Sequence, residues 1–305
     1  MAGMEEEGSE LGFGFRVGHW TDEAGRTGCT VVLPPLGNVT SCDIRGSSPS
    51  SRELTHLDTQ RKLTEVHAIL LTGGSAFGLA AADGVMTWLA EREIGYQTPI
   101  ARVPIVPAAV IFDLGAGSPD ARPGASQGRA ACEAATEGPV ARGLVGAGTG
   151  ATVGKWAGFG GAQPGGLGVG RASYGTAEVS ALAVVNPVGD VISETGEVLR
   201  GTTLPEPREL FPERPPPGTN TVLVVLAMRA TYDKATVQWL ASRGSDGIAR
   251  AVRPAHTRYD GDVVFATAVP PEPGVPEPRL DVMAHLATEA VAAAVRDAVL
   301  VTPTG

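Results

Sequence analysis

Thr221 stands at an abrupt change in the character of the sequence. It follows residues 201–220, which hold six prolines among glutamates and arginines, and it opens the apolar run Thr-Val-Leu-Val-Val-Leu-Ala of residues 221–227. Proline is excluded from helix interiors and central strands, so residues 201–220 are predicted to be a surface linker that feeds a buried strand. Chemistry on the polypeptide at this junction would be both accessible and rigidly held.

A threonine hydroxyl is a weak nucleophile unless a base takes its proton. If the bond between Asn220 and Thr221 is cut, the new α-amine of Thr221 supplies that base, because its reference pKa of about 7.7–8.0 lies near neutral pH. An Asn-Thr pair before a strand is also an ordinary turn, and the local pattern alone leaves both interpretations open. Self-cleavage needs no histidine, so all five are interpreted as surface or core residues: His19, His56, His67, His256 and His285.

The segments around this junction predict a mixed α and β fold. Residues 28–34 and 66–72 are short apolar runs closed by proline or glycine, as in buried strands. Ser75 is placed to cap a helix that runs to about Arg92, and further helices are predicted at 125–136, 232–243 and 281–299. Residues 179–194 predict a strand, a turn at 186–190 and a second strand. Glycine is dense from 143 to 175, which favours close backbone approach around a substrate or between subunits.

Composition narrows the class of protein and its partners. The 305 residues carry a net charge of −9 without a run of Lys or Arg, which argues against nucleic acid or an anionic membrane surface and favours a small substrate. One compact domain, 1–305, is expected. The three cysteines are far apart and are expected to be buried free thiols in a reducing cytoplasm. Glu5, Glu6 and Glu7 stand where a signal peptide would be positive, and no apolar stretch reaches the roughly 18 residues of a membrane span.

No cofactor is predicted. Gly154-Lys155 looks like part of a phosphate-binding loop, but Thr149 replaces its first glycine and Trp156 its Ser/Thr. The pattern Gly146-x-Gly148 lacks the helix that a dinucleotide site requires.

Several motifs in one order resemble the P1-type peptidase family, which includes D-aminopeptidases, β-aminopeptidases and nylon-oligomer hydrolases. They are Val17-Gly18-His19, residues 71–85 (LTGGSAFGLAAADGV), Lys155, Asn186-Pro187, Thr219-Asn220-Thr221 and Asp260-Gly261-Asp262. The likeness covers nearly the whole chain. It looks closest to the nylon-oligomer hydrolases, because the aminopeptidase branch typically cleaves at Gly-Ser and has Ser-Gly-Glu in place of Asp-Gly-Asp.

The resemblance implies an α/β (α+β) four-layer αββα sandwich, like that of the ornithine acetyltransferases, and a homo-oligomer, expected to be a tetramer. It makes Thr221 the nucleophile of a hydrolase for linear amides such as 6-aminohexanoate oligomers, cut into fragments 1–220 and 221–305. An aminopeptidase, an ornithine acetyltransferase-like acyltransferase and an uncleaved assembly protein are the alternatives.

Lys155 and Asn186 are the first supporting residues that the resemblance implies. Lys155 could hold the threonine oxygen or tune the amine by its charge, and is otherwise a solvated surface lysine. The amide of Asn186 could donate to the oxyanion of a tetrahedral intermediate, although an Asn before proline is also a common turn residue.

Asp260 and Asp262 complete the implied site. Two residues apart, they would face one side of an extended chain, where one could pair with Lys155 and the other orient the Thr221 amine. The alternative is an Asp-Gly hairpin turn. Phe112 is a departure from the family, because it occupies the apparent place of an oxyanion-binding tyrosine and has no donor.

Overall fold

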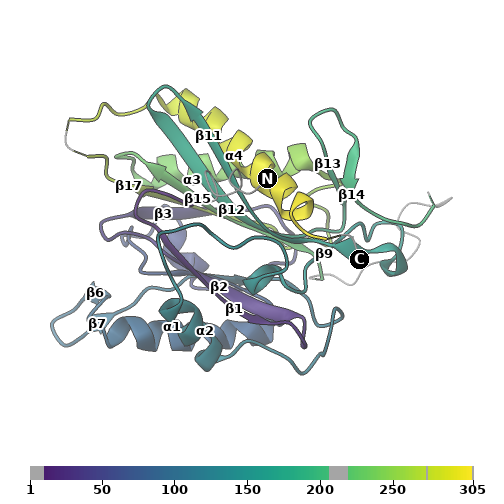
Figure 1. Cartoon of the computed structure of the whole chain (residues 1–305). Coiled ribbons are helices and arrows are strands. Elements are labelled where there is room, and N and C mark those ends of the chain that lie inside the picture. The colour runs from purple at the N-terminus through teal and green to yellow at the C-terminus, as the bar shows by residue number, and fades with distance from the viewer. Residues whose placement is uncertain (1–9, 206–218, 273, 304–305) are drawn as a thin grey trace.

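The protein is described by a computed structural model over residues 10–205, 219–272 and 274–303. Two five-stranded sheets lie face to face, and a pair of helices covers the outer face of each sheet (Figure 1). The predicted four-layer αββα sandwich is therefore confirmed. No helix in these ranges is both long enough and apolar enough to cross a membrane.

The first sheet has the strand order β1-β2-β5-β8-β4, with α1 (Ala81–Ala90) and α2 (Ala125–Glu133) against its outer face. Its strands are β1 (Arg16–Asp22), β2 (Thr27–Leu33), β4 (Ser51–Arg52), β5 (Ile69–Thr72) and β8 (Ala108–Val110). Strands β6 (Tyr96–Gln97) and β7 (Arg102–Val103) form a separate two-stranded sheet.

The second sheet has the order β11-β12-β15-β17-β3 and is covered by α3 (Lys234–Ala251) and α4 (Leu280–Leu300). Its strands are β3 (Val39–Ile44), β11 (Gly166–Tyr174), β12 (Ala177–Asn186), β15 (Thr221–Arg229) and β17 (Val263–Val269). Beside it lie β9 (Thr152–Val153) with β10 (Gln163–Pro164), and β13 (Asp190–Ile192) between β14 (Val198–Arg200) and β16 (Val252–Arg253).

Strand β15 contributes to two apolar layers, one on each face of its sheet. Val222, Val224 and Leu226 pack with α3 and α4, whereas Leu223 and Val225 pack between the two sheets. Side chains alternate between the faces of a strand, so a continuous apolar run fits only a strand that is buried on both faces. Each fully buried Val or Leu stabilises the fold by roughly 1.5–3 kcal/mol, which fixes the register of the strand that begins at Thr221.

The glycines of β11 bring the backbone of α4 close to the sheet. A Cβ atom added at Gly168 would lie 2.3 Å from the carbonyl oxygen of Ala294, and one at Gly170 would lie 2.2 Å from that of Ala290. These two glycines therefore serve close packing within the chain.

Most predicted elements are present. The predicted strand 28–34 corresponds to β2, which begins one residue earlier, and β5 falls within 66–72. Helices α2, α3 and α4 match the predicted helices, although α3 continues to Ala251. After the turn at 186–190, β13 joins a different small sheet instead of pairing back on β12. Residues 206–218 of the predicted linker lie outside the described ranges. All three cysteines are free and buried, as predicted.

The predicted cap at Ser75 is wrong. Ser75 has φ of 54° and makes no side-chain cap bond, and it begins a 3-10 helix, Ser75–Ala80, that precedes α1. A side chain does bind at the start of this helix, but it is the carboxylate of Asp113. Its Oδ1 accepts from the Gly74 N–H at 2.7 Å. A distant carboxylate has thus replaced the local hydroxyl that helix-capping rules favour.

Candidate active site

The ends of three strands bring the predicted site residues to one edge of the second sheet. Strands β12 and β15 are antiparallel, and their register places Asn186 opposite Thr221. Strands β15 and β17 are parallel, so the residues before each strand are neighbours, and Asn220 forms a bridge with Asp260. Topology therefore explains why residues as far apart in the sequence as Val188 and Asp260, 72 positions, meet here.

The peptide bond between Asn220 and Thr221 is buried, with these residues 0% and 3% exposed. In the uncut chain, the Thr221 hydroxyl donates to the carbonyl oxygen of Asn220. The Gly261 N–H donates to the same oxygen at 2.8 Å. A nucleophilic group therefore lies beside this carbonyl while a fixed backbone donor polarises it.

Lys155 is a buried lysine held by an amide oxygen. It follows β9, and its backbone N–H donates to the Val188 carbonyl at 2.8 Å. Its Nζ donates to Oδ1 of Asn186 at 2.9 Å and to the Asn186 carbonyl at 3.2 Å. Burial lowers the pKa of Lys155 to about 7, and the charge of Asp260 opposes this shift. The side chain is therefore close to half-protonated at neutral pH.

Within the described ranges, Lys155 forms no ion pair with either carboxylate of the Asp-Gly-Asp motif. The expected pairing is replaced by the contact with Asn186. Asn186 also accepts from the Thr152 N–H at 2.9 Å, and its Nδ2 donates to the Phe112 carbonyl at 3.4 Å. The acceptor end of the amide is therefore firmly bound, and its donor end makes one long contact.

Asp260 is a buried carboxyl that accepts hydrogen bonds from two backbone N–H groups and one hydroxyl. Its Oδ1 accepts from the Val188 N–H at 3.1 Å, and its Oδ2 accepts from the N–H and hydroxyl of Thr257 at 2.9 and 2.5 Å. Burial and then the nearby charge of Asp262 raise the pKa of Asp260 to about 6. The carboxyl therefore fixes the loop between β16 and β17 next to the peptide that joins Asn220 and Thr221. The segment is not the Asp-Gly hairpin considered as an alternative, because it leads into a strand parallel to β15.

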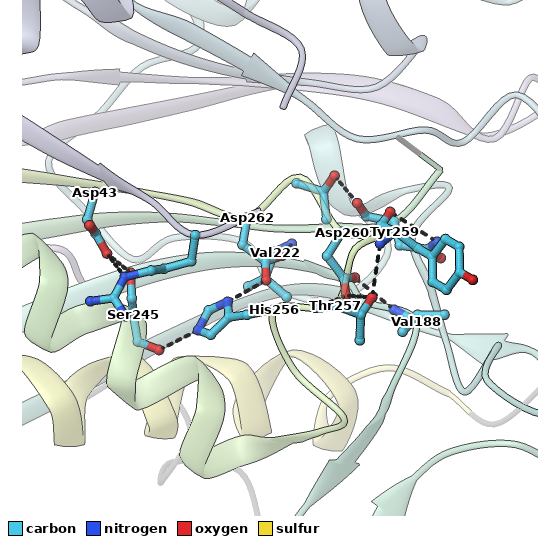
Figure 2. Close-up of polar contacts among 12 residues, drawn as sticks. Asp43, Val188, Val222, Ser245, His256, Thr257, Tyr259, Asp260 and Asp262 are labelled. Carbon is cyan, nitrogen blue, oxygen red and sulfur yellow. Dashed lines mark hydrogen bonds and ion pairs between the residues drawn. The ribbon is translucent and has the colours of Figure 1, made fainter. Parts of the chain in front are cut away.

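Asp262 lies one peptide from the candidate nucleophile. Its Oδ1 accepts from the N–H of Val222 at 2.7 Å, and its Oδ2 contacts Nδ1 of His256 at 2.7 Å (Figure 2). Neither His256 nor the donor N–H of Gly261 was recognised from the sequence. Backbone donors carry no residue signature, but a histidine only six residues before the second aspartate was a usable signal.

A pocket of about 210 Å³ adjoins this centre. Lys155 and Thr219 lie in its wall, together with the mainly apolar residues Phe112, Ala116, Phe159 and Ala162. Thr221 itself is not part of the lining. The pocket thus lies beside the Asn220–Thr221 peptide, on the side of Lys155.

The glycine-rich segment 71–85 contacts Asp113, a residue of the pocket wall. Asp113 lines the pocket, and its Oδ2 accepts from the Thr27 hydroxyl at 2.7 Å. A Cβ atom added at Gly73 would lie 2.0 Å from this oxygen, so only glycine fits there. The Gly73-Gly74 pair therefore sets the position of Asp113 in the pocket wall.

The fold is shared with solved amidohydrolase structures. The L-aminopeptidase D-Ala-esterase/amidase of Ochrobactrum anthropi, a variant of the Ntn hydrolase fold, superposes with a TM-score of 0.70 at 19% identity over 98% of this chain and 87% of its own. The model of peptidase family S58 matches residues 13–304. The chain belongs to this family of amide-bond hydrolases, which confirms the resemblance seen in its motifs.

Relatives with two kinds of name are similar to the chain. An uncharacterised aminopeptidase of Mycobacterium leprae is 44% identical over 270 residues, covering 79% of this chain and 70% of the relative. The 6-aminohexanoate-oligomer endohydrolase of an Agromyces species is 32% identical over 305 residues, covering 94% and 83%. The likeness to nylon-oligomer hydrolases is thus confirmed, and the aminopeptidase alternative is equally consistent with these findings.

Proposed function

We propose that the chain cuts itself between Asn220 and Thr221, and that the freed Thr221 then hydrolyses linear amide bonds. The observation that carries this proposal is the hydroxyl of Thr221 on the carbonyl of the preceding residue, with the Gly261 N–H on the same oxygen. Cleavage would leave fragments 1–220 and 221–305 of one compact domain.

In the first reaction, the Thr221 oxygen attacks the Asn220 carbonyl carbon, and the Gly261 N–H stabilises the oxyanion. The carbon–nitrogen bond breaks, the nitrogen takes a proton to become the α-amine, and an ester joins Asn220 to the threonine oxygen. Water then hydrolyses this ester. The products are the carboxyl-terminal Asn220 and the amino-terminal Thr221.

In the mature enzyme, the α-amine of Thr221 takes the proton of its own hydroxyl as that oxygen attacks a substrate amide. The substrate amine leaves, and water hydrolyses the resulting ester. Lys155 supplies positive charge beside the site, and Asn186 supplies an amide donor for the oxyanion, which Phe112 cannot supply.

The two carboxyls have positioning roles in this proposal. Asp262 holds the peptide that follows Thr221 through the Val222 N–H, and Asp260 holds the loop that carries the Gly261 donor. Both carboxyls therefore orient the Thr221 hydroxyl, and neither takes its proton.

The pocket supports a substrate with an extended apolar acyl part. The surface of its lining is mainly apolar, and Lys155 at its wall is bound to Asn186, which lies opposite Thr221 in the sheet. Short linear amides such as 6-aminohexanoate oligomers fit this description, as does the resemblance to their endohydrolase. Peptides with a free amino end are the second candidate, which the 44% identical aminopeptidase-named relative favours. We further propose a cytoplasmic homo-oligomer, a tetramer of cleaved protomers, testable by light scattering.

Intact mass spectrometry of the purified protein tests the proposal. Wild type is expected to give fragments 1–220 and 221–305, and Thr221→Ser, which keeps the hydroxyl, is expected to cleave as well. Thr221→Val keeps the shape of this buried residue and removes only the hydroxyl, so it should stay a single chain without amidase activity. A cleaved Thr221→Val protein, or a wild type that hydrolyses amides at full rate while uncut, would refute the mechanism. Assays on aminohexanoate oligomers and amino-acid p-nitroanilides, with and without ornithine as acyl acceptor, then identify the substrate class.

A further inference from the structure

His256 is the histidine nearest to the candidate nucleophile, and both of its ring nitrogens face acceptors. Nδ1 lies 2.7 Å from Oδ2 of Asp262, and Nε2 lies 3.0 Å from the carbonyl oxygen of Ser245 on α3 (Figure 2). A carboxylate and a carbonyl both accept, so both nitrogens must donate, which requires the doubly protonated ring. The two contacts therefore fit the doubly protonated ring, with Asp262 as its partner.

The environment of the ring agrees with this charge. Burial alone lowers the pKa of His256, but the hydrogen bond and the charge of Asp262 outweigh it, and the pKa is raised. The Ser245 carbonyl adds to the rise, and Arg45 opposes it. The ion pair is largely buried, with 18% of the histidine side chain and 3% of the aspartate side chain exposed.

We propose that His256 is a positioning residue that acts through Asp262 on Thr221, an inference that rests on the proposed function. The imidazolium binds one carboxylate oxygen, which leaves the other oxygen fixed on the Val222 N–H. This N–H belongs to the peptide that joins Thr221 to the rest of β15. The direction of the nucleophile in its strand is thereby set from outside the site, both before and after cleavage.

A second explanation of the same contacts is purely structural. Through the Ser245 carbonyl, the ring also ties the loop before β17 to α3, and the Ser245 hydroxyl in turn donates to Asp43 at 2.6 Å. The two explanations assign importance to different ring nitrogens. In the positioning role, the Nδ1 bond to Asp262 matters, whereas a structural tie depends on the Nε2 bond to the helix.

Two conservative variants separate these bonds. Asparagine can place an N–H near the position of Nδ1, so His256→Asn keeps the donor to Asp262 and loses the contact with α3. Glutamine can place an N–H near Nε2, so His256→Gln keeps the tie to Ser245 and loses the bond to Asp262. Because misplacement of a reacting group by about 1 Å costs on the order of 10²-fold in rate, we expect His256→Gln and His256→Ala to lose roughly that factor in kcat and to cleave themselves more slowly.

His256→Asn is expected to stay within about fivefold of wild type in both rates, because the carboxylate keeps a donor. KM should change by less than about threefold in all variants, because the pocket lies on the side of Lys155. The matched control is His285→Gln, since this histidine lies on α4 with 68% of its side chain exposed.

His256 has a φ of 51°, a conformation that Asn adopts more readily than Gln, so the Asn/Gln pair is compared only where the two variants have equal thermal unfolding midpoints. Under that condition the pair decides even if the alanine variant does not fold. The positioning role would be overturned if the kcat of His256→Gln equalled or exceeded that of His256→Asn. A His256→Ala variant with the wild-type kcat would overturn it as well. A wild type that neither cuts itself nor hydrolyses amides would instead overturn the proposed function, and this inference with it.

Discussion

Lys155 is the residue in which charge and burial conflict most strongly. Its Nζ is bound by the two oxygens of Asn186, and burial lowers its pKa from 10.5 to about 7. At pH values between about 7 and 10.5, Lys155 is protonated in the unfolded chain and mostly neutral in the folded chain, so the unfolded chain binds more protons. The free energy of unfolding must therefore rise with pH through this window.

We expect Lys155→Met to remove this slope, because methionine fills similar space without a titratable group. In an uncut Thr221→Val background, the free energy of unfolding of the Lys155-containing protein should increase between pH 7 and pH 10 by a few kcal/mol relative to Lys155→Met. Urea unfolding at several pH values measures this pH dependence of the free energy of unfolding. The exposed Lys62 provides the control variant Lys62→Met, which should leave the slope unchanged. Parallel stability curves for Lys155→Met and its parent would show that Lys155 keeps its proton in the folded protein throughout this pH range, and would contradict the lowered pKa.

At the scale of elements, β11 and α4 are packed backbone to backbone. The two glycines at 168 and 170 provide the space, and alanines on α4 provide the matching surface. This contact places β11 at the edge of the sheet and thus supports β12, whose last residue is Asn186.

Gly168→Ala should therefore destabilise the protein by about 1–3 kcal/mol, the usual cost of overpacking. The added Cβ would meet the Ala294 carbonyl oxygen and the Ala298 nitrogen, both at 2.3 Å, and neither backbone atom can move without shifting α4. Gly160→Ala is the matched control, because nothing lies within 4 Å of a Cβ atom there. Thermal unfolding of the two variants compares them. An unchanged melting temperature for Gly168→Ala would mean that α4 is free to move away from the sheet.

The sequence was sufficient for elements whose signal is periodic. The apolar run 222–228 of β15 and the long α4 are predictable, because burial on both sides of a strand or on most of a helix leaves few polar positions. Ser75 and His256 could not be assigned in this way. At Ser75, the local turn depends on Asp113, a distant carboxylate that binds the Gly74 N–H. At His256, the role depends on both ring contacts, and of these the nearby Asp262 was visible in the sequence while the Ser245 carbonyl on α3 was not. The family resemblance supplied the four-layer order, which composition alone did not.

At the scale of the whole molecule, the proposed cut divides the sheets unequally. Residues 221–305 supply the central strands β15 and β17 and the covering helices α3 and α4. Residues 1–220 supply β11, β12 and β3 on either side of those strands, and the entire first sheet. The smaller fragment is therefore inserted between strands of the larger one.

We expect the two fragments to remain together after cleavage and to unfold in one transition. Separating them would break the ladders between β12 and β15 and between β17 and β3, and would expose the apolar layers on both faces of the sheet. Such burial is the dominant stabilising term in a fold, and no interface of this kind opens without general unfolding. Size-exclusion chromatography should give one peak containing both fragments, at the elution volume of uncut Thr221→Val, and calorimetry should give one transition. Fragments that separate in native buffer, or two resolved transitions, would show that residues 221–305 are not held in the sheet as the strand order requires.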